Sequence, residues 1–155
     1  MTQQKKKWST KKKIFAAIGA VVVILAAIYI YFATQTFDGT KSIKEDYTVN
    51  ALDFIKEFRA NDSAANQKYR EKIIIVTGIV SEVEAPDTST FNIKFIDTAT
   101  QDYAIFAFQE QYLRESKSVK AGDKVSIKGS CSGSSFTEIL DAYSIPFKRS
   151  TLIKN

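Results

Sequence analysis

The residues that could do chemistry in this chain are few, and their types exclude several mechanisms. The 155 residues include no histidine and a single cysteine, Cys131. Without histidine there is no Ser-His-Asp or Cys-His activation of a nucleophile and no histidine-ligated metal or haem. A lone cysteine cannot close an internal disulfide or build a multi-cysteine zinc site. We therefore expect Cys131 to be a small, semi-buried residue and not a redox centre.

The remaining patterns that could support catalysis are weak. Asp97 and Asp102 could approach each other across a hairpin, but two carboxylates in a turn are usually solvated and match no calcium loop or acid/base pair. The stretch from Gly129 to Gly133 lacks the Lys-Ser/Thr of a phosphate-binding loop. We predict a protein that is not an enzyme and that uses no cofactor or metal. The minor alternative is a hydrolase that works with carboxylates alone, which requires acids with a raised pKa.

A few polar and aromatic residues on expected strands are better suited to binding. A lysine beside an aromatic ring is the minimum arrangement for stacking a base or a sugar while holding a charge. The candidate binding face comprises five residues: Asn92, Lys94, Tyr103, Lys124 and Lys128. The simpler alternative is an ordinary solvated strand face.

The elements that hold these residues are mainly strands. Runs of β-branched and alternating apolar residues predict strands over residues 73–80, 91–96, 103–108, 124–129 and 136–145, with a short helix over 109–118. Lys124 and Lys128 should face outward on the fourth strand, and Gly78 predicts a bulge or a bend in the first. Pro146 is expected to end the last strand, and the residues beyond Phe147 to fray.

A helix is predicted before the first strand. Asn50 can cap this helix, and Asn61 interrupts it. Leu52, Ile55 and Phe58 recur at three-residue steps and form one apolar stripe. The order of helix, three strands, short helix and two strands predicts a mainly β domain with flanking helices, a five-stranded Greek-key barrel of the OB type. Closing the barrel hides the edges of so few strands.

An uncharged segment near the N-terminus has the length of a membrane span. Ile14 to Phe32 comprises nineteen residues without a charge. A helix of that length covers roughly 28 Å, close to the thickness of the hydrocarbon core of a bilayer. Six lysines and no acidic residue precede it, which predicts a cytoplasmic N-terminus and an extracytoplasmic C-terminal domain. The alternative is a cleaved signal peptide, whose apolar core is shorter, about 7–15 residues.

The charge distribution agrees with this organisation. The formal net charge of +5 and the pI near 9.2 suggest nucleic-acid binding at first sight. However, residues 1–37 carry +6, whereas residues 38–155 hold 16 basic and 17 acidic residues and carry −1. The predicted parts are a basic cytoplasmic tail (1–13), a transmembrane helix (14–33), a linker (34–46), the OB-fold domain (47–147) and a C-terminal tail (148–155).

Two stretches of this domain carry a family resemblance. The first combines Ala51-Leu52, Phe58, Asn61, Ala64-Ala65, Lys68-Tyr69 and Lys72 with the run Ile75-Val76-Thr77-Gly78-Ile79-Val80. The second reads Gly122-Asp123-Lys124-Val125-Ser126-Ile127-Lys128-Gly129-Ser130-Cys131-Ser132-Gly133. Both resemble the tRNA-anticodon-like (tRNA_anti-like) OB-fold family, over roughly Tyr47 to Ile145.

This resemblance implies a small bacterial protein behind a signal or membrane anchor. Together with the lysines before the uncharged segment, it predicts a domain on the periplasmic side of the inner membrane. Family members often carry a second cysteine in the last strand, which could pair with the one corresponding to Cys131. The corresponding stretch here is Leu140-Asp141-Ala142-Tyr143, so an internal disulfide is lost.

The leading functional hypothesis is a single-pass, membrane-anchored OB-fold binding module. It is attached through Ile14 to Phe32, and its partner is an envelope protein, a peptide or a glycan. The alternative is a protein that binds single-stranded nucleic acid. We rank nucleic acid lower because the domain carries −1 and is expected outside the cytoplasm.

Overall fold

The computed structural model describes residues 19–30, 39–87, 89–108 and 110–153. The chain divides into two units, Met1–Phe37 and Asp38–Asn155. In the first unit, residues 19–30 form a helix. Residues 14–18 and 31–33 of the expected membrane span lie outside the described residues. Over the described ranges, no helix combines the length and the apolar character needed to cross a membrane.

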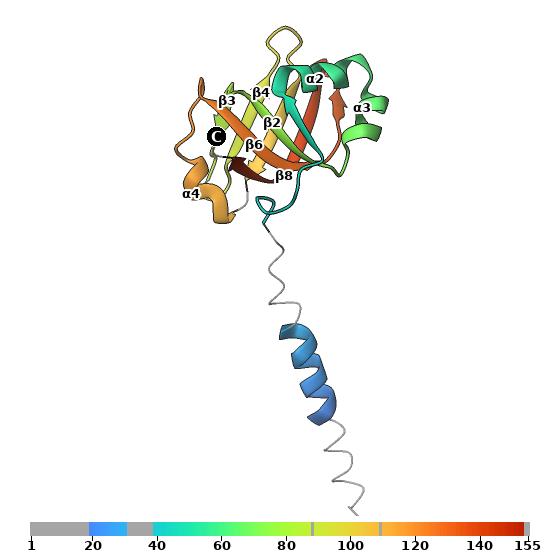
Figure 1. The fold of residues 1–155 in the computed structure, drawn as a ribbon, viewed down its shortest axis with the longest axis vertical. Coiled ribbons are helices and arrows are strands. Elements are labelled where there is room, and N and C mark those ends of the chain that lie inside the picture. Colours follow the sequence, from blue (N-terminus) through green and yellow to red (C-terminus); the bar gives the residue numbers. More distant parts are fainter. Residues whose placement is uncertain (1–18, 31–38, 88, 109, 154–155) are drawn as a thin grey trace, which may run out of the picture. The chain divides into compact units, whose positions relative to one another are not determined.

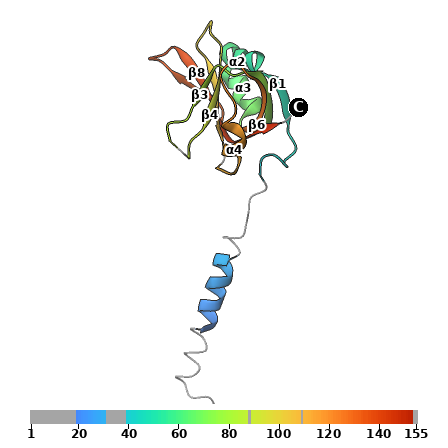
Figure 2. The same cartoon turned by 90° about the vertical axis from the view of Figure 1, so that its left-hand side faces the viewer.

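The second unit is mainly β with flanking helices, as the sequence predicts (Figure 1). Its helices are α2 (Ala51–Ala60), α3 (Asp62–Tyr69), the 3-10 turn η1 (Glu110–Tyr112) and α4 (Leu113–Ser116). Its strands are β1 (Tyr47–Asn50), β2 (Ile73–Ile79), β3 (Glu82–Glu84), β4 (Asn92–Ile96), β5 (Tyr103–Phe108), β6 (Lys124–Cys131), β7 (Ser135–Thr137) and β8 (Ala142–Ile153). Helices α2 and α3 lie at one end of the sheet and α4 lies at the other (Figure 2).

The two ends of the sheet are connected by one continuous segment, which comprises β2 and β3. The described strands follow the order β1-β2-β6-β8-β5-β4-β3, with β7 paired to β8. Only Val80 and Ser81 separate β2 from β3. This continuous segment pairs with β6 through β2 and with β4 through β3. The sheet therefore closes into a ring of five segments: β2 with β3, then β4, β5, β8 and β6. This is the order expected of a small OB-type barrel.

Gly78 is required by packing and does not form a bulge, contrary to the prediction. The pairing of β2 with β6 runs without a shift from Ile73 to Ile79. A Cβ atom on Gly78 would lie 2.6 Å from the Cβ of Ala51 on α2. Three residues after Gly78 the segment has changed partner, because the Ser81 N–H donates to the carbonyl of Lys94 on β4 at 2.9 Å.

The prediction that Pro146 ends the last strand is wrong. Strand β8 continues through Pro146 to Ile153, so residues 148–153 of the expected tail belong to the sheet. Pro146 sits where β8 changes partner, from β7 over residues 142–144 to β6 over residues 147–153. Its carbonyl accepts a hydrogen bond from Ser132 N–H at 2.8 Å, just beyond the end of β6. Pro146 has no partner in the β7 or the β6 ladder, so its missing N–H costs neither a bond, and on the other edge of β8 it stands opposite Ile105 of β5.

The helix preceding the barrel buries a face shifted from the predicted stripe. Ala51, Phe54, Ile55 and Phe58 are buried, while Leu52 is 46% exposed. These four positions follow the i, i+3, i+4, i+7 spacing of one helical face, and Leu52 falls outside it. The predicted cap and interruption are confirmed, because Asn50 accepts from Leu52 N–H at 3.0 Å and Asn61 accepts from Ala64 N–H at 3.0 Å.

The segment before β1, expected as a linker, is packed onto the barrel over its described residues. Thr40 is 1% exposed. Asp46 N–H donates to the Ile73 carbonyl at 2.7 Å, and the Asp46 carboxylate accepts from Ile73 N–H at 2.9 Å. The chain therefore joins the folded unit before the predicted boundary at Tyr47.

Candidate functional site

Three of the five predicted binding residues lie together on β4 and β5. Asn92 and Lys94 share one face of β4, and the Lys94 ammonium lies 5.3 Å from the centre of the Tyr103 ring. However, the Lys94 ammonium also contacts Glu84, and it lies 3.3 Å from the carboxylate of Glu82. Burial disfavours the charge on Lys94, but the hydrogen bonds and charges of the two glutamates prevail and raise the pKa of Lys94. This lysine stays protonated, and its charge is already neutralised by neighbours.

The two other predicted residues do not join this face. The Lys128 side chain is only 6% exposed, and its ammonium lies 3.2 Å from the Glu45 carboxylate. The prediction that Lys128 faces solvent is wrong, because the segment before β1 covers that part of β6. Lys124 is exposed at the start of β6 and lines a separate cavity.

This cavity, which we call the seam pocket, has a volume of about 430 Å³ and opens between β2, β4 and the first turn of α2. It is lined by Asn50, Ala51, Leu52, Gly78, Ile79, Ser81, Phe95, Ile96, Asp97, Thr98 and Lys124. It exists because strand pairing lapses there: β1 reaches only Thr77 of β2, and β3 reaches only Lys94 of β4. Between those limits, Gly78 and Ile79 pair with β6 on one side and have no described strand on the other.

The walls of the seam pocket are largely apolar. Ile79 is 64% exposed and Leu52 46% exposed, although each is a large hydrophobic residue. Phe95 is buried behind them, 3.4 Å from where a Cβ on Gly78 would lie. Such an apolar concavity with a few polar groups is the usual form of a ligand site. Sequence reasoning missed it, because it assigned Leu52 to the buried stripe of the helix together with Ile55 and Phe58.

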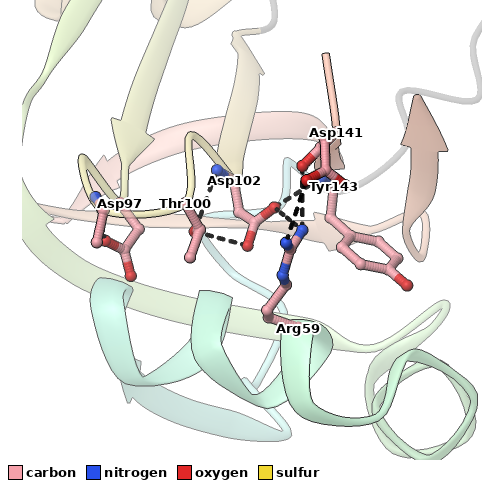
Figure 3. Close-up of polar contacts among 7 residues, drawn as sticks. Arg59, Asp97, Thr100, Asp102, Asp141 and Tyr143 are labelled. Atoms are coloured by element: carbon pink, nitrogen blue, oxygen red, sulfur yellow. Dashed lines mark hydrogen bonds and ion pairs between the residues drawn. The ribbon is translucent and has the colours of Figure 1, made fainter. Parts of the chain in front are cut away.

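The two hairpin aspartates are buried, so the expectation that they are solvated is wrong. Asp102 is 1% exposed and Asp97 is 7% exposed. The Asp102 carboxylate accepts from the Thr100 hydroxyl at 2.7 Å and from Tyr143 N–H at 2.8 Å, and it pairs with the Arg59 guanidinium at 3.4 Å (Figure 3). It ties α2 and β8 to the β4–β5 hairpin, which is a structural role.

Asp97 is held differently. One carboxylate oxygen, Oδ1, accepts from Ala99 N–H at 3.0 Å, which closes the turn after β4. The carboxylate points toward the first turn of α2 (Figure 3) and lines the seam pocket. The two aspartates therefore do not form an acid/base pair, because Asp102 is committed to its own partners.

Cys131 lies in the interior of the described domain. Cys131 is fully buried, deeper than the semi-buried position predicted, and its thiol is free. Burial raises the pKa of this thiol to about 11, so the reactive thiolate is scarce at neutral pH. Over the described residues, no group of three or more His, Cys, Asp or Glu side chains could hold a metal ion.

Comparisons with known proteins agree with the barrel. The model of the tRNA_anti-like family matches residues 1–141. A solved structure from Klebsiella pneumoniae, described as a candidate nucleic acid-binding lipoprotein, is similar with 16% identity and a TM-score of 0.52. The match covers 78% of this chain and 100% of that one.

Two further structures are more distant. An asparaginyl-tRNA synthetase from Entamoeba histolytica has 13% identity and a TM-score of 0.39, with 70% of this chain and 24% of that chain covered. A replication protein A heterotrimer bound to single-stranded DNA has 8% identity and a TM-score of 0.32, with 54% and 58% covered. The search of curated proteins finds no match.

Proposed function

Because the chain belongs to the tRNA_anti-like family, whose model matches residues 1–141, we propose that it is a non-catalytic OB-fold binding module whose ligand enters the seam pocket. The ligand is a peptide or another molecule of the cell envelope that presents an apolar group. The observation that carries the proposal is the pairing of an apolar cavity of about 430 Å³ with two exposed aliphatic side chains, Leu52 and Ile79, at its edge.

The charges of the domain favour such a ligand over single-stranded nucleic acid. Phosphate binding needs cations that are free to pair with the backbone. Lys94 is already paired with two glutamates, and Lys128 is buried against Glu45. Residues 38–155 carry a net charge of −1, so the domain has no global field that would attract a polyanion.

We include membrane attachment in the proposal. The uncharged stretch from Ile14 to Phe32 and the six lysines before it support a single-pass anchor with the barrel outside the cytoplasm. Protease treatment of intact and of osmotically opened bacteria tests this, using a C-terminal tag. Digestion once the outer membrane is opened is expected, and a tag that stays protected until the inner membrane is broken would contradict it.

Binding of a neutral apolar dye tests the pocket itself. The full chain, prepared without free detergent, is titrated with N-phenyl-1-naphthylamine, whose fluorescence rises in apolar surroundings. We expect saturable binding that Ile79→Asp weakens by about tenfold or more, because a charge in the cavity wall would be desolvated. The matched control is Ile139→Asp, since Ile139 is 94% exposed and does not line the pocket.

Two results would contradict the proposal. One is equal dye binding by the wild type, Ile79→Asp and Ile139→Asp. The other is tight, salt-dependent binding of a thirty-nucleotide oligo(dT) that is lost in Lys94→Ala, which would favour the nucleic-acid alternative.

A further inference from the structure

The two buried aspartates of the β4–β5 turn differ in how completely they are paired. Asp102 receives three side-chain or backbone donors, from Thr100, Tyr143 and Arg59. Asp97 receives one, from Ala99 N–H to Oδ1. Within the described residues, no hydrogen bond or ion pair reaches its second oxygen, Oδ2. Burial of a carboxylate is costly unless its charge is paired, so the incomplete pairing of Asp97 calls for an explanation.

The unpaired oxygen of Asp97 faces the seam pocket. In the described chain, the side-chain atoms that are both fully buried and unpaired are Thr40 Oγ1 and Ser150 Oγ. Asp97 Oδ2 is not one of them, so it remains reachable although the residue is only 7% exposed. Figure 3 shows the carboxylate directed at the first turn of α2, whose residues Ala51 and Leu52 line the same cavity.

The local fold does not need a charge at this position. The turn after β4 uses only Oδ1, and an asparagine would accept the same hydrogen bond from Ala99 N–H without burying an ionised group. The described residues supply no compensating cation. Lys124 is the one basic residue that lines the cavity, and no ion pair joins it to Asp97 among the described residues. The charge of Asp97 is therefore available to something that enters the pocket.

We infer that the seam pocket binds a primary ammonium group carried on an apolar body, with Asp97 Oδ2 accepting the charged N–H. The inference rests on the proposed function and names the ligand chemistry of the same site. Leu52, Ile79 and Phe95 surround the apolar body, while the buried carboxylate fixes the ammonium in surroundings where a charged hydrogen bond is strong. Two sources share this chemistry: a small free amine and the amino terminus of a peptide with an apolar first residue.

Lys124 adds an exposed positive charge to the lining of the seam pocket. Its exposed ammonium lies at the start of β6, beside Ile79 in the β2–β6 register. A ligand that carries a second cation would meet this charge, whereas a ligand with a neutral or anionic far end would not. The pocket should therefore prefer a monoamine to a diamine of the same length.

Competition against N-phenyl-1-naphthylamine on the full chain tests the inference. The probes are 1-hexylamine, 1-hexanol and 1,6-hexanediamine, which share one apolar body and differ in charge. A charged hydrogen bond contributes about 1.5–3 kcal/mol, which corresponds to roughly a ten- to hundredfold lower half-displacement concentration for hexylamine than for hexanol. Asp97→Asn should remove this preference while keeping the turn. Asp141→Asn is the matched control, since the Asp141 side chain is 81% exposed.

The peptide source is tested with Leu-Ala-Ala amide and its N-acetylated form. Displacement of the dye by hexylamine, by the free peptide or by both supports the inference when Asp97→Asn abolishes it. Equal displacement by hexylamine and hexanol in the wild type overturns the inference but leaves the proposed function standing. Retention of the amine preference in Asp97→Asn also overturns it. Absence of dye binding to the wild type is the separate outcome that rejects the proposed function.

Discussion

Replacement of Asp102 by alanine should destabilise the domain strongly. Asp102 is 1% exposed and joins three elements, since it accepts from Thr100 at 2.7 Å and from Tyr143 N–H at 2.8 Å and pairs with Arg59 at 3.4 Å. Asp102→Ala leaves two donors without an acceptor and one cation without its buried partner. Removing one member of a buried ion pair costs about 3–5 kcal/mol.

The loss of stability in Asp102→Ala comes more from the unpaired Thr100 hydroxyl and Tyr143 N–H than from the broken ion pair with Arg59. The Arg59 side chain is 35% exposed and can reach water, which weakens its share. The two remaining donors each cost about 1–3 kcal/mol when left unpaired. We therefore expect a decrease of about 3 kcal/mol or more in the free energy of unfolding. That is a large fraction of the roughly 5–15 kcal/mol that holds a typical domain together.

Urea denaturation of the full chain, followed by far-UV circular dichroism, measures the change. Asp141→Asn is the matched control, because Asp141 also faces Arg59, at 3.8 Å, but its side chain is 81% exposed, and asparagine tolerates its positive φ of 47°. The control should change the free energy of unfolding by about 0.5 kcal/mol or less. If Asp102→Ala and Asp141→Asn lose the same small amount, Asp102 is not the tie between α2, the hairpin and β8.

Three other changes have defined outcomes. Gly78→Val should lower the unfolding free energy by about 1–3 kcal/mol and abolish dye binding, because its Cβ would lie 2.6 Å from that of Ala51; unchanged dye affinity would contradict this. Truncation after Phe147 should abolish cooperative urea unfolding, whereas truncation after Ile153 should leave it intact, since residues 147–153 of β8 pair with β6. The Cys131 pKa near 11 against an ordinary value of 9.0 means that the folded state holds a proton that the unfolded state releases. Stability should therefore fall between pH 9 and 11, by an amount on the order of 2 kcal/mol that Cys131→Ala removes in parallel pH series.

Local patterns in the sequence predicted the parts of the fold that depend on near neighbours. The alternation of Phe91, Ile93 and Phe95 placed one face of β4 in the core, where all three are buried. Asn50 and Asn61 were identified as helix boundaries because an Asn side chain can accept from the backbone a few residues ahead. Both inferences need only the period of a strand or the geometry of a helix end.

Apart from the shifted stripe of α2, the main errors concern partners distant in the chain. Lys128 looks solvent-facing in an alternating strand, but Glu45, which lies far from it in the sequence, covers it. Pro146 reads as a strand terminator unless the change of partner from β7 to β6 is known. The seam pocket arises from the ends of two ladders on different strands, and its buried Asp97 reads as a solvated turn residue for the same reason. A single sequence shows the preference of each residue for helix or strand. It does not show the pairing register that brings distant strands together.

The position of β8 in the sheet determines when the barrel can close during synthesis of the chain. Strand β8 follows all the others along the chain, yet it lies between β6 and β5 in the sheet. Until residues 142–153 leave the ribosome, β6 and β5 lack the strand that lies between them and the ring cannot close. The nascent domain therefore cannot complete its fold until its last strand has been synthesised.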